Sequence, residues 1–103
     1  MVAIVENKIP EIVDLCKKHK LKSLYLFGSA TDAKYFNKKS DVDFLYEYDK
    51  KKIKELDYAD NYFDFLFSLK KILKRNVDLM PNEKLKNPYL LKQINSEKIR
   101  IYG

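Results

Sequence analysis

The segment Leu24–Ser29, with the sequence LYLFGS, decides the fold together with Ser40–Leu45, with the sequence SDVDFL. The first segment is short, apolar and aromatic, which predicts a buried strand ended by a Gly-Ser turn. The second places Asp41 and Asp43 two residues apart, so both carboxylates lie on one face of a strand. Aspartate is disfavoured inside strands, and unpaired charge beside a core is costly. We therefore expect a site for a hard cation and a phosphate here, the alternative being solvated carboxylates at a strand edge.

The composition predicts one globular domain spanning residues 1–103. An apolar content of 46% and an aromatic content of 14% argue against disorder. The single cysteine, Cys16, excludes an internal disulfide and favours a reducing compartment. No stretch has the length of a membrane span or of a secretory signal core, so we expect a cytoplasmic protein.

The net charge of +6 permits two interpretations. It could attract a polyanion, or it could reflect lysine-rich coding without functional meaning. The lysines follow no recognisable nucleic-acid-binding motif, so we do not expect nucleic acid as a partner.

Hydrophobic periodicity and turn residues predict a sheet covered by a few helices. The expected helices are Pro10–His19, a short one at Ser29–Lys34, Asp60–Leu73 and Tyr89–Asn95, and the expected strands are Ser23–Phe27, Asp41–Tyr48, Asn76–Met80 and Lys98–Tyr102.

Two side-chain environments are also predicted. His19 is the only histidine and lies among lysines at a helix end, which indicates an exposed capping residue. Phe65 and Phe67 widen the apolar stripe of the Asp60–Leu73 helix, so we expect the face around them to contact a partner.

A third carboxylate, Asp78, lies on the short strand that follows this helix and could converge on Asp41 and Asp43. Three oxygen ligands with open positions suit Mg²⁺, which retains waters and binds substrate phosphate. A pair of such ions about 4 Å apart would hold the attacking and leaving oxygens of an in-line displacement. Gly28 and Ser29 would hold the outer phosphates. The sequence has no His/Cys cluster that would bind zinc, and no nucleophile–base pair can be assembled around His19.

These motifs resemble those of the nucleotidyltransferase superfamily related to DNA polymerase β. The resemblance rests on Phe27–Ser29 (FGS), an interval of eleven residues, Asp41–Asp43 (DVD), and Asp78 on a later strand. The chain size and the ending Asn87–Tyr89 (NPY) and Ile101–Tyr102 (IY) are similar to the minimal nucleotidyltransferases (MNT), the antitoxins of HEPN/MNT toxin–antitoxin pairs.

The resemblance implies an α/β (α+β) fold, with a mixed sheet flanked by helices, and transfer of a nucleoside monophosphate from a nucleoside triphosphate. Similar members adenylylate a tyrosine on a HEPN-domain ribonuclease toxin, using ATP and two Mg²⁺ ions. By position, Gly28 and Ser29 would bind the triphosphate, and Asp41 and Asp43 would hold the metals. Asp78 would complete the second metal site and help to deprotonate the acceptor hydroxyl.

The sequence departs from the family pattern at one place, and two alternative functions are open. The family often continues Gly-Ser-X-Ala-Arg-Gly, whereas Ala30–Ala33 here reads ATDA. The chain could be a weak or inactive MNT fold that neutralises a toxin by contact, or a small-molecule nucleotidyltransferase of the antibiotic-modifying type. Whether it forms a homo-oligomer is left open.

Overall fold

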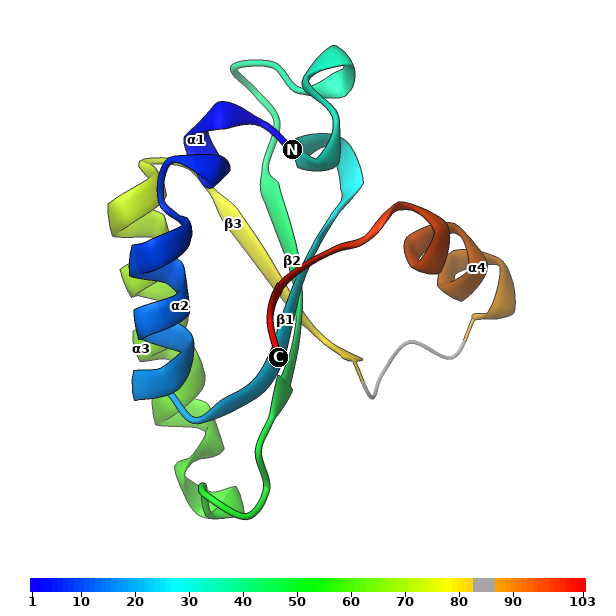
Figure 1. Cartoon of the computed structure of the whole chain (residues 1–103). Helices are drawn as coiled ribbons and strands as arrows, with labels where there is room; N and C mark the ends of the chain where they lie inside the picture. The colour runs from blue at the N-terminus through cyan, green and yellow to red at the C-terminus, as the bar shows by residue number, and fades with distance from the viewer. Residues whose placement is uncertain (83–86) are drawn as a thin grey trace.

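The computed structural model describes residues 1–82 and 87–103 and contains a four-stranded sheet of order β3-β2-β1-β4 (Figure 1). Strand β1 (Leu21–Phe27) pairs antiparallel with β2 (Val42–Tyr48) and with β4 (Ile99–Tyr102). Strand β3 (Val77–Pro81) pairs parallel with β2. The parallel pair requires a crossover, which the helix between β2 and β3 supplies, and the sheet is mixed as expected.

Two long helices cover one face of this sheet, and a third lies on its other side (Figure 1). The helices are α1 (Ala3–Glu6), α2 (Ile9–Lys18), α3 (Tyr58–Leu73) and α4 (Pro88–Glu97). Short 3₁₀ turns lie between β1 and β2, at η1 (Gly28–Thr31) and η2 (Ala33–Tyr35), and directly before α3, at η3 (Glu55–Asp57). Helices α2 and α3 pack side by side. None of the helices in the described ranges is long and apolar enough to cross a bilayer.

The core lies between the sheet and the helix pair. Alternate strand residues point toward α2 and α3, as the period of two requires, and burial of each large side chain contributes roughly 1.5–3 kcal/mol. The buried residues of the strands include Leu24, Leu26, Val42, Phe44, Val77 and Leu79, and those of the two helices are Ile12, Cys16, Phe65, Leu69 and Leu73.

The predicted strands and long helices are present, with ends shifted by a few residues. The short helix predicted at Ser29–Lys34 is wrong, because two separate 3₁₀ turns replace it. Asp32 lies between them in an extended conformation, and its carboxylate accepts a hydrogen bond of 3.0 Å from the Lys34 N–H. The helix Ala3–Glu6 was not predicted.

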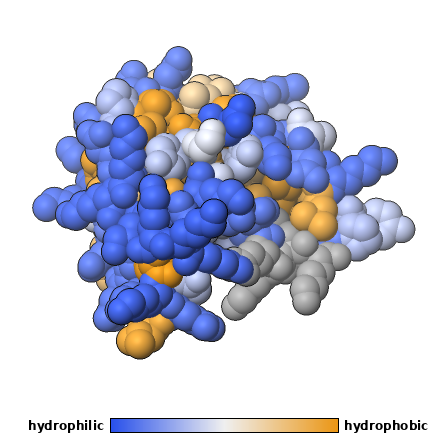
Figure 2. All heavy atoms as spheres, turned by 60° about the horizontal axis from the view of Figure 1, so that its bottom comes forward, coloured by the Kyte–Doolittle hydropathy of each residue, from blue (hydrophilic) through white to orange (hydrophobic). Residues whose placement is uncertain are grey.

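The loop between β2 and α3 forms the lower end of the molecule in Figure 1. The 3₁₀ turn η3 forms the last part of this loop. Ile53 anchors the loop to the core with 7% of its surface exposed. Figure 2, which brings this end forward, shows mainly hydrophilic side chains with hydrophobic ones in small, separate groups.

His19 corrects one prediction. It does cap the end of α2, but only 4% of it is exposed. Its Nδ1 lies 2.9 Å from the Leu15 carbonyl oxygen, and its ring centroid lies 5.3 Å from that of Phe65. Asn61 of α3 donates a hydrogen bond of 2.7 Å to the His19 carbonyl oxygen. The packing of α3 across the end of α2 buries the histidine, and local sequence does not reveal that contact.

Phe65 corrects another prediction. It is completely buried, so it cannot contact a partner. It shares a helix face with Leu69, four residues later, and this face meets the core. Phe63 and Phe67 instead lie on the outer side of α3, with 51% and 59% of their surfaces exposed.

The buried thiol of Cys16 permits a direct test of the fold. Burial raises the pKa of this thiol to about 12, and the side chain is completely buried. Because the thiolate is the reactive form, we expect the folded protein near pH 8 to react negligibly with Ellman's reagent within an hour. In concentrated guanidinium chloride it should release one equivalent of thionitrobenzoate. Rapid reaction of the folded protein would contradict this position for Cys16.

Candidate active site

The strand register brings two of the predicted aspartates together. Asp43 on β2 is the direct partner of Asp78 on the parallel strand β3, and of Phe27 at the end of β1. Since Val42 and Phe44 point into the helix-covered core, Asp43 and Asp78 point to the opposite face. The strand register therefore sets Asp78 beside Asp43, the second aspartate of the Asp-X-Asp motif.

Asp41 precedes β2 and is exposed, as is Asp78, whereas Asp43 is partly buried. Burial raises the pKa of Asp43 to about 6, with further contributions from the negative charges of Asp78 and then Asp41. The ionised form is thus unfavourable by itself, and a nearby cation would remove that cost. Clustered carboxylates are the donor set that suits Mg²⁺.

The side chains are not gathered into a finished metal site. Among the described residues, no three Asp, Glu, His or Cys side chains stand together as a ready-made group of ligands. The carboxylates therefore fit a divalent cation by their chemistry, and they must rotate to gather around one. Asp41 is exposed at the edge of the strand, so it has room for such a rotation.

The Gly28–Ser29 turn lies directly against the Asp43 carboxylate. Gly28 has a positive φ of +73°, and a Cβ added to it would lie 2.5 Å from Asp43 Oδ2. This position therefore requires glycine for its backbone conformation and for space. The Thr31 hydroxyl donates a hydrogen bond of 2.7 Å to the Gly28 carbonyl oxygen and closes the turn.

A hollow of about 460 Å³ opens beside this turn, which is within the size range of small-molecule sites. Its lining residues are Gly28, Ser29, Thr31, Asp32, Tyr35, Gln93 and Glu97. Gln93 and Glu97 come from α4, and sequence reasoning missed them because no local signal links that helix to the turn. Two of the lining residues, Asp32 and Glu97, are acidic and none is basic. Thr31 and Asp32, which depart from the family pattern, both make local hydrogen bonds.

Arg75 holds the loop that leads to Asp41 in place. Its Nη2 donates hydrogen bonds of 2.5 Å to the Asn37 carbonyl oxygen and 2.6 Å to that of Ser40. Its guanidinium lies 4.4 Å from the centre of the Phe36 ring. These contacts attach the loop before β2 to the end of α3, and they therefore position Asp41.

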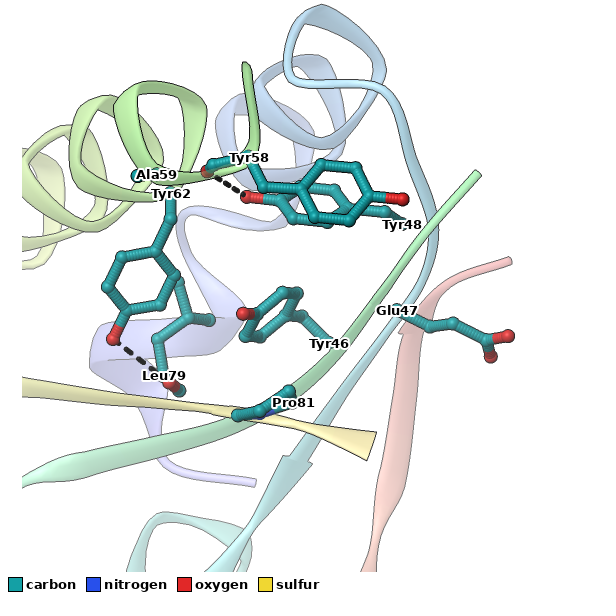
Figure 3. A pocket seen from close by; sticks show the side chains of 8 residues that line it. All are labelled: Tyr46, Glu47, Tyr48, Tyr58, Ala59, Tyr62, Leu79 and Pro81. Atoms are coloured by element: carbon teal, nitrogen blue, oxygen red, sulfur yellow. Dashed lines mark hydrogen bonds between the residues drawn. The ribbon is translucent and has the colours of Figure 1, made fainter. Parts of the chain in front are cut away.

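A tyrosine-rich pocket of about 480 Å³ lies between α3 and the far end of β2 (Figure 3). The Tyr48 hydroxyl donates to the Tyr58 carbonyl oxygen at 3.3 Å, and the Tyr62 hydroxyl donates to that of Leu79 at 3.1 Å. Burial raises the pKa of both Tyr48 and Tyr62. Figure 3 shows Glu47 directed away from these rings. Since backbone carbonyls accept hydrogen bonds from both partly buried hydroxyls, this pocket belongs to the packing of α3 on the sheet.

The mixed four-stranded sheet with these helices is the nucleotidyltransferase fold. The chain belongs to the family described as "Polymerase beta, Nucleotidyltransferase", whose model matches residues 10–103. Two proteins of Methanocaldococcus jannaschii, both provisionally named protein adenylyltransferases, are similar to it. MJ1379 is 30% identical over 101 residues, and MJ0128 is 33% identical over 101 residues. Each match covers 90% of this chain and 97% of the relative.

Solved structures share the fold at lower identity. A minimal nucleotidyltransferase, provisionally described as such, superposes with a TM-score of 0.72 at 22% identity, covering 92% of this chain and 90% of that one. A toxin–antitoxin structure with AMP-PNP gives 0.68 at 21% identity, with coverages of 92% and 73%. The complex of a tri-AMPylated Shewanella oneidensis HEPN toxin with its MNT antitoxin gives 0.62 at 19% identity, with coverages of 95% and 71%.

Proposed function

We propose that this protein transfers AMP from ATP to a tyrosine hydroxyl of a HEPN-domain ribonuclease toxin and thereby acts as its antitoxin. The observation that carries the proposal is the pairing of Asp43 with Asp78 on neighbouring strands, with the Gly28 turn against Asp43. The names of the two archaeal relatives and the toxin–antitoxin neighbours support the choice of acceptor.

Each candidate residue has a distinct role in the proposed reaction. Gly28 and Ser29 bind the triphosphate through the turn that ends β1. Asp41 and Asp43 would hold two Mg²⁺ ions, whose charge would stabilise the attacking and leaving oxygens. Asp78 would complete the second metal site and accept the proton of the acceptor hydroxyl. The hydroxyl oxygen forms a bond to the α-phosphorus as the bond to the bridging oxygen breaks and pyrophosphate departs.

The proposal includes repeated transfer. The HEPN toxin in one structural neighbour carries three AMP groups. By analogy, the first AMP on the acceptor of this protein would present a ribose hydroxyl to a second ATP, and the second AMP to a third.

Transfer of radiolabel tests this function. The protein is incubated with α-labelled ATP, Mg²⁺ and the purified product of the neighbouring gene. Label should appear on the partner and disappear when Asp41 and Asp43 are both replaced by asparagine, because these carboxylates would hold the metals. The control is Asp14→Asn, at an exposed position on α2. Label on an aminoglycoside and never on protein would instead indicate an antibiotic-modifying enzyme.

A second candidate is an inactive fold that neutralises the toxin by contact. Asp32 and Glu97 favour it, because their carboxylates line the hollow beside Gly28 and would repel a triphosphate. Protection of cells from the toxin that survives the double asparagine substitution would support this candidate over the enzyme.

A further inference from the structure

We propose that a positively charged hollow beside Asp41 binds the phosphodiester of an acceptor that already carries AMP, and so supports the second and later transfers. This inference rests on the proposed function. The hollow, here called the basic pocket, has a volume of about 440 Å³. Its charged lining residues are Lys38, Lys39, Asp41, Lys70, Lys74 and Arg75.

The basic pocket joins segments that are distant in sequence. Lys38 and Lys39 come from the loop before β2, Lys70 from the last turn of α3, and Lys74 and Arg75 from the connection to β3. Cations at the end of α3 are expected from the helix dipole alone. The helix dipole does not account for Lys38 and Lys39 in the loop. Bringing these two lysines to the same hollow costs free energy through repulsion between the cations, and a bound anion offsets that cost.

The pocket is held in shape before any ligand binds. Arg75 bonds to two carbonyl oxygens of the 37–40 loop and stacks on Phe36. Lys74 has a φ of +55°, in the left-handed region, which ends α3 and turns the chain toward β3. Asp41 forms part of the pocket wall, so a ligand here lies next to the proposed reaction centre.

Charge and position separate this pocket from the hollow beside the Gly28–Ser29 turn. That hollow lies at the end of β1, and its described lining residues include two acids and no base. The basic pocket lies before β2 and β3, and Asp41 belongs to its lining. In an in-line transfer the acceptor and the leaving pyrophosphate occupy opposite sides of the phosphorus. In this proposal pyrophosphate lies at the turn and the acceptor lies on the side of the basic pocket, beside Asp41.

The acceptors of the first and of the later transfers then differ in charge. The first acceptor is a neutral tyrosine hydroxyl, which does not require a cationic pocket. The second acceptor is a ribose hydroxyl of the attached AMP, whose phosphodiester carries a negative charge. Its oxygen bonds to the α-phosphorus of a new ATP, pyrophosphate leaves with the bonding electrons, and the proton passes to Asp78. The pocket holds the existing phosphodiester by charge-assisted contacts while this occurs.

The test uses Lys39→Gln with Lys74→Gln, which removes two pocket cations and leaves Arg75 in place. The matched control, Lys51→Gln with Lys54→Gln, removes the same charge from the exposed loop at the opposite end of β2. Intact-mass spectrometry follows the partner protein as it gains one, two and three AMP groups. We expect the first addition to stay within about twofold of wild type and the later ones to fall about tenfold or more, with the control unchanged. An unchanged AMP distribution would overturn the proposal. An equal decrease in the rates of all three AMP additions, with a raised KM for ATP, would also overturn the proposal, because the pocket would then bind the donor.

A binding experiment tests the pocket independently of activity. Fluorescent triadenylate is titrated into each protein in metal-free buffer at several salt concentrations. The pocket variant should bind at least about tenfold more weakly than wild type, and its salt dependence should be shallower by roughly 0.7 per lost phosphate contact. Equal binding by the variant would contradict the inference. Affinity that rises steadily with the length of an unrelated RNA would also overturn it, by indicating an RNA-binding surface. Failure of AMP transfer with pocket-dependent triadenylate binding would reject the proposed function and retain the phosphodiester site.

Discussion

Replacing Asp43 with asparagine is expected to abolish nucleotidyl transfer and, in metal-free buffer near pH 8, to raise the melting temperature. We expect activity to fall by about a thousandfold or more, comparable to the loss of a principal charge-stabilising group. The stability gain arises because the ionised Asp43 is partly buried and faces two other carboxylates. The residue therefore destabilises the fold in the state that the proposed chemistry requires.

The sign of the pH dependence follows from the raised pKa of Asp43. This pKa is about 6 in the folded protein against an ordinary value of 3.8. Between these values the folded state binds more protons than the unfolded state, so stability falls as the pH rises. The contribution of Asp43 to the stability of the folded state is fully present below about pH 4 and is lost as the pH rises through about 6. With allowance for solvent screening of a partly exposed group, the loss amounts to about 1–2 kcal/mol.

Thermal unfolding across this pH range measures the effect. The Asp43→Asn variant should melt several degrees above wild type near pH 8 and at about the same temperature near pH 4. Added Mg²⁺ should raise the melting temperature of wild type more than that of the variant, because ligand binding stabilises the folded state. Asp64→Asn, at an exposed position on α3, serves as the control. A variant less stable than wild type near pH 8 would show that Asp43 has a stabilising partner.

Replacing Gly28 with alanine is expected to reduce both stability and transfer. The new Cβ would lie 2.5 Å from Asp43 Oδ2, and alanine would have to adopt a φ of +73°. The positive φ of alanine alone lowers the free energy of unfolding by about 1–2 kcal/mol. Displacement of the Asp43 carboxylate lowers it further. We expect a total loss of about 2–3 kcal/mol in the free energy of unfolding, and a loss of activity because Asp43 is moved from its place beside the turn.

A double-mutant cycle separates the two causes. In an Asp43→Ala background the carboxylate that the Cβ meets is gone, so Gly28→Ala should cost only the conformational part. Urea unfolding of the four proteins would measure the coupling energy, which we expect to be about 1 kcal/mol. An equal cost of Gly28→Ala in both backgrounds would mean that the Cβ is accommodated without disturbing Asp43.

Local patterns were sufficient to predict much of this protein. The apolar run that ends at Phe27 predicts a strand, and the Gly-Ser pair predicts its turn, because both depend on neighbouring residues. The spacing of Asp41 and Asp43 predicts that both lie on one face of a strand, for the same reason. These features, with Asp78, supported the resemblance to a nucleotidyltransferase that the family match has confirmed.

Long-range packing decided the rest. The register that sets Asp78 beside Asp43 depends on how α3 returns the chain to the sheet. The packing of α3 on the rest of the core also buries His19 and the helix's own Phe65, both of which were predicted to be accessible.

By itself, the sequence determined which residues could form strands, helices, the Gly-Ser turn and the Asp41–Asp43 pair, since these follow from neighbours along the chain. Only the tertiary structure decided that Arg75 holds the loop before Asp41 and that α4 brings Glu97 to the turn. It also gathered the lysines of two distant segments into the basic pocket. The physical reason is that these contacts join parts of the chain whose proximity is set by burial of a shared core.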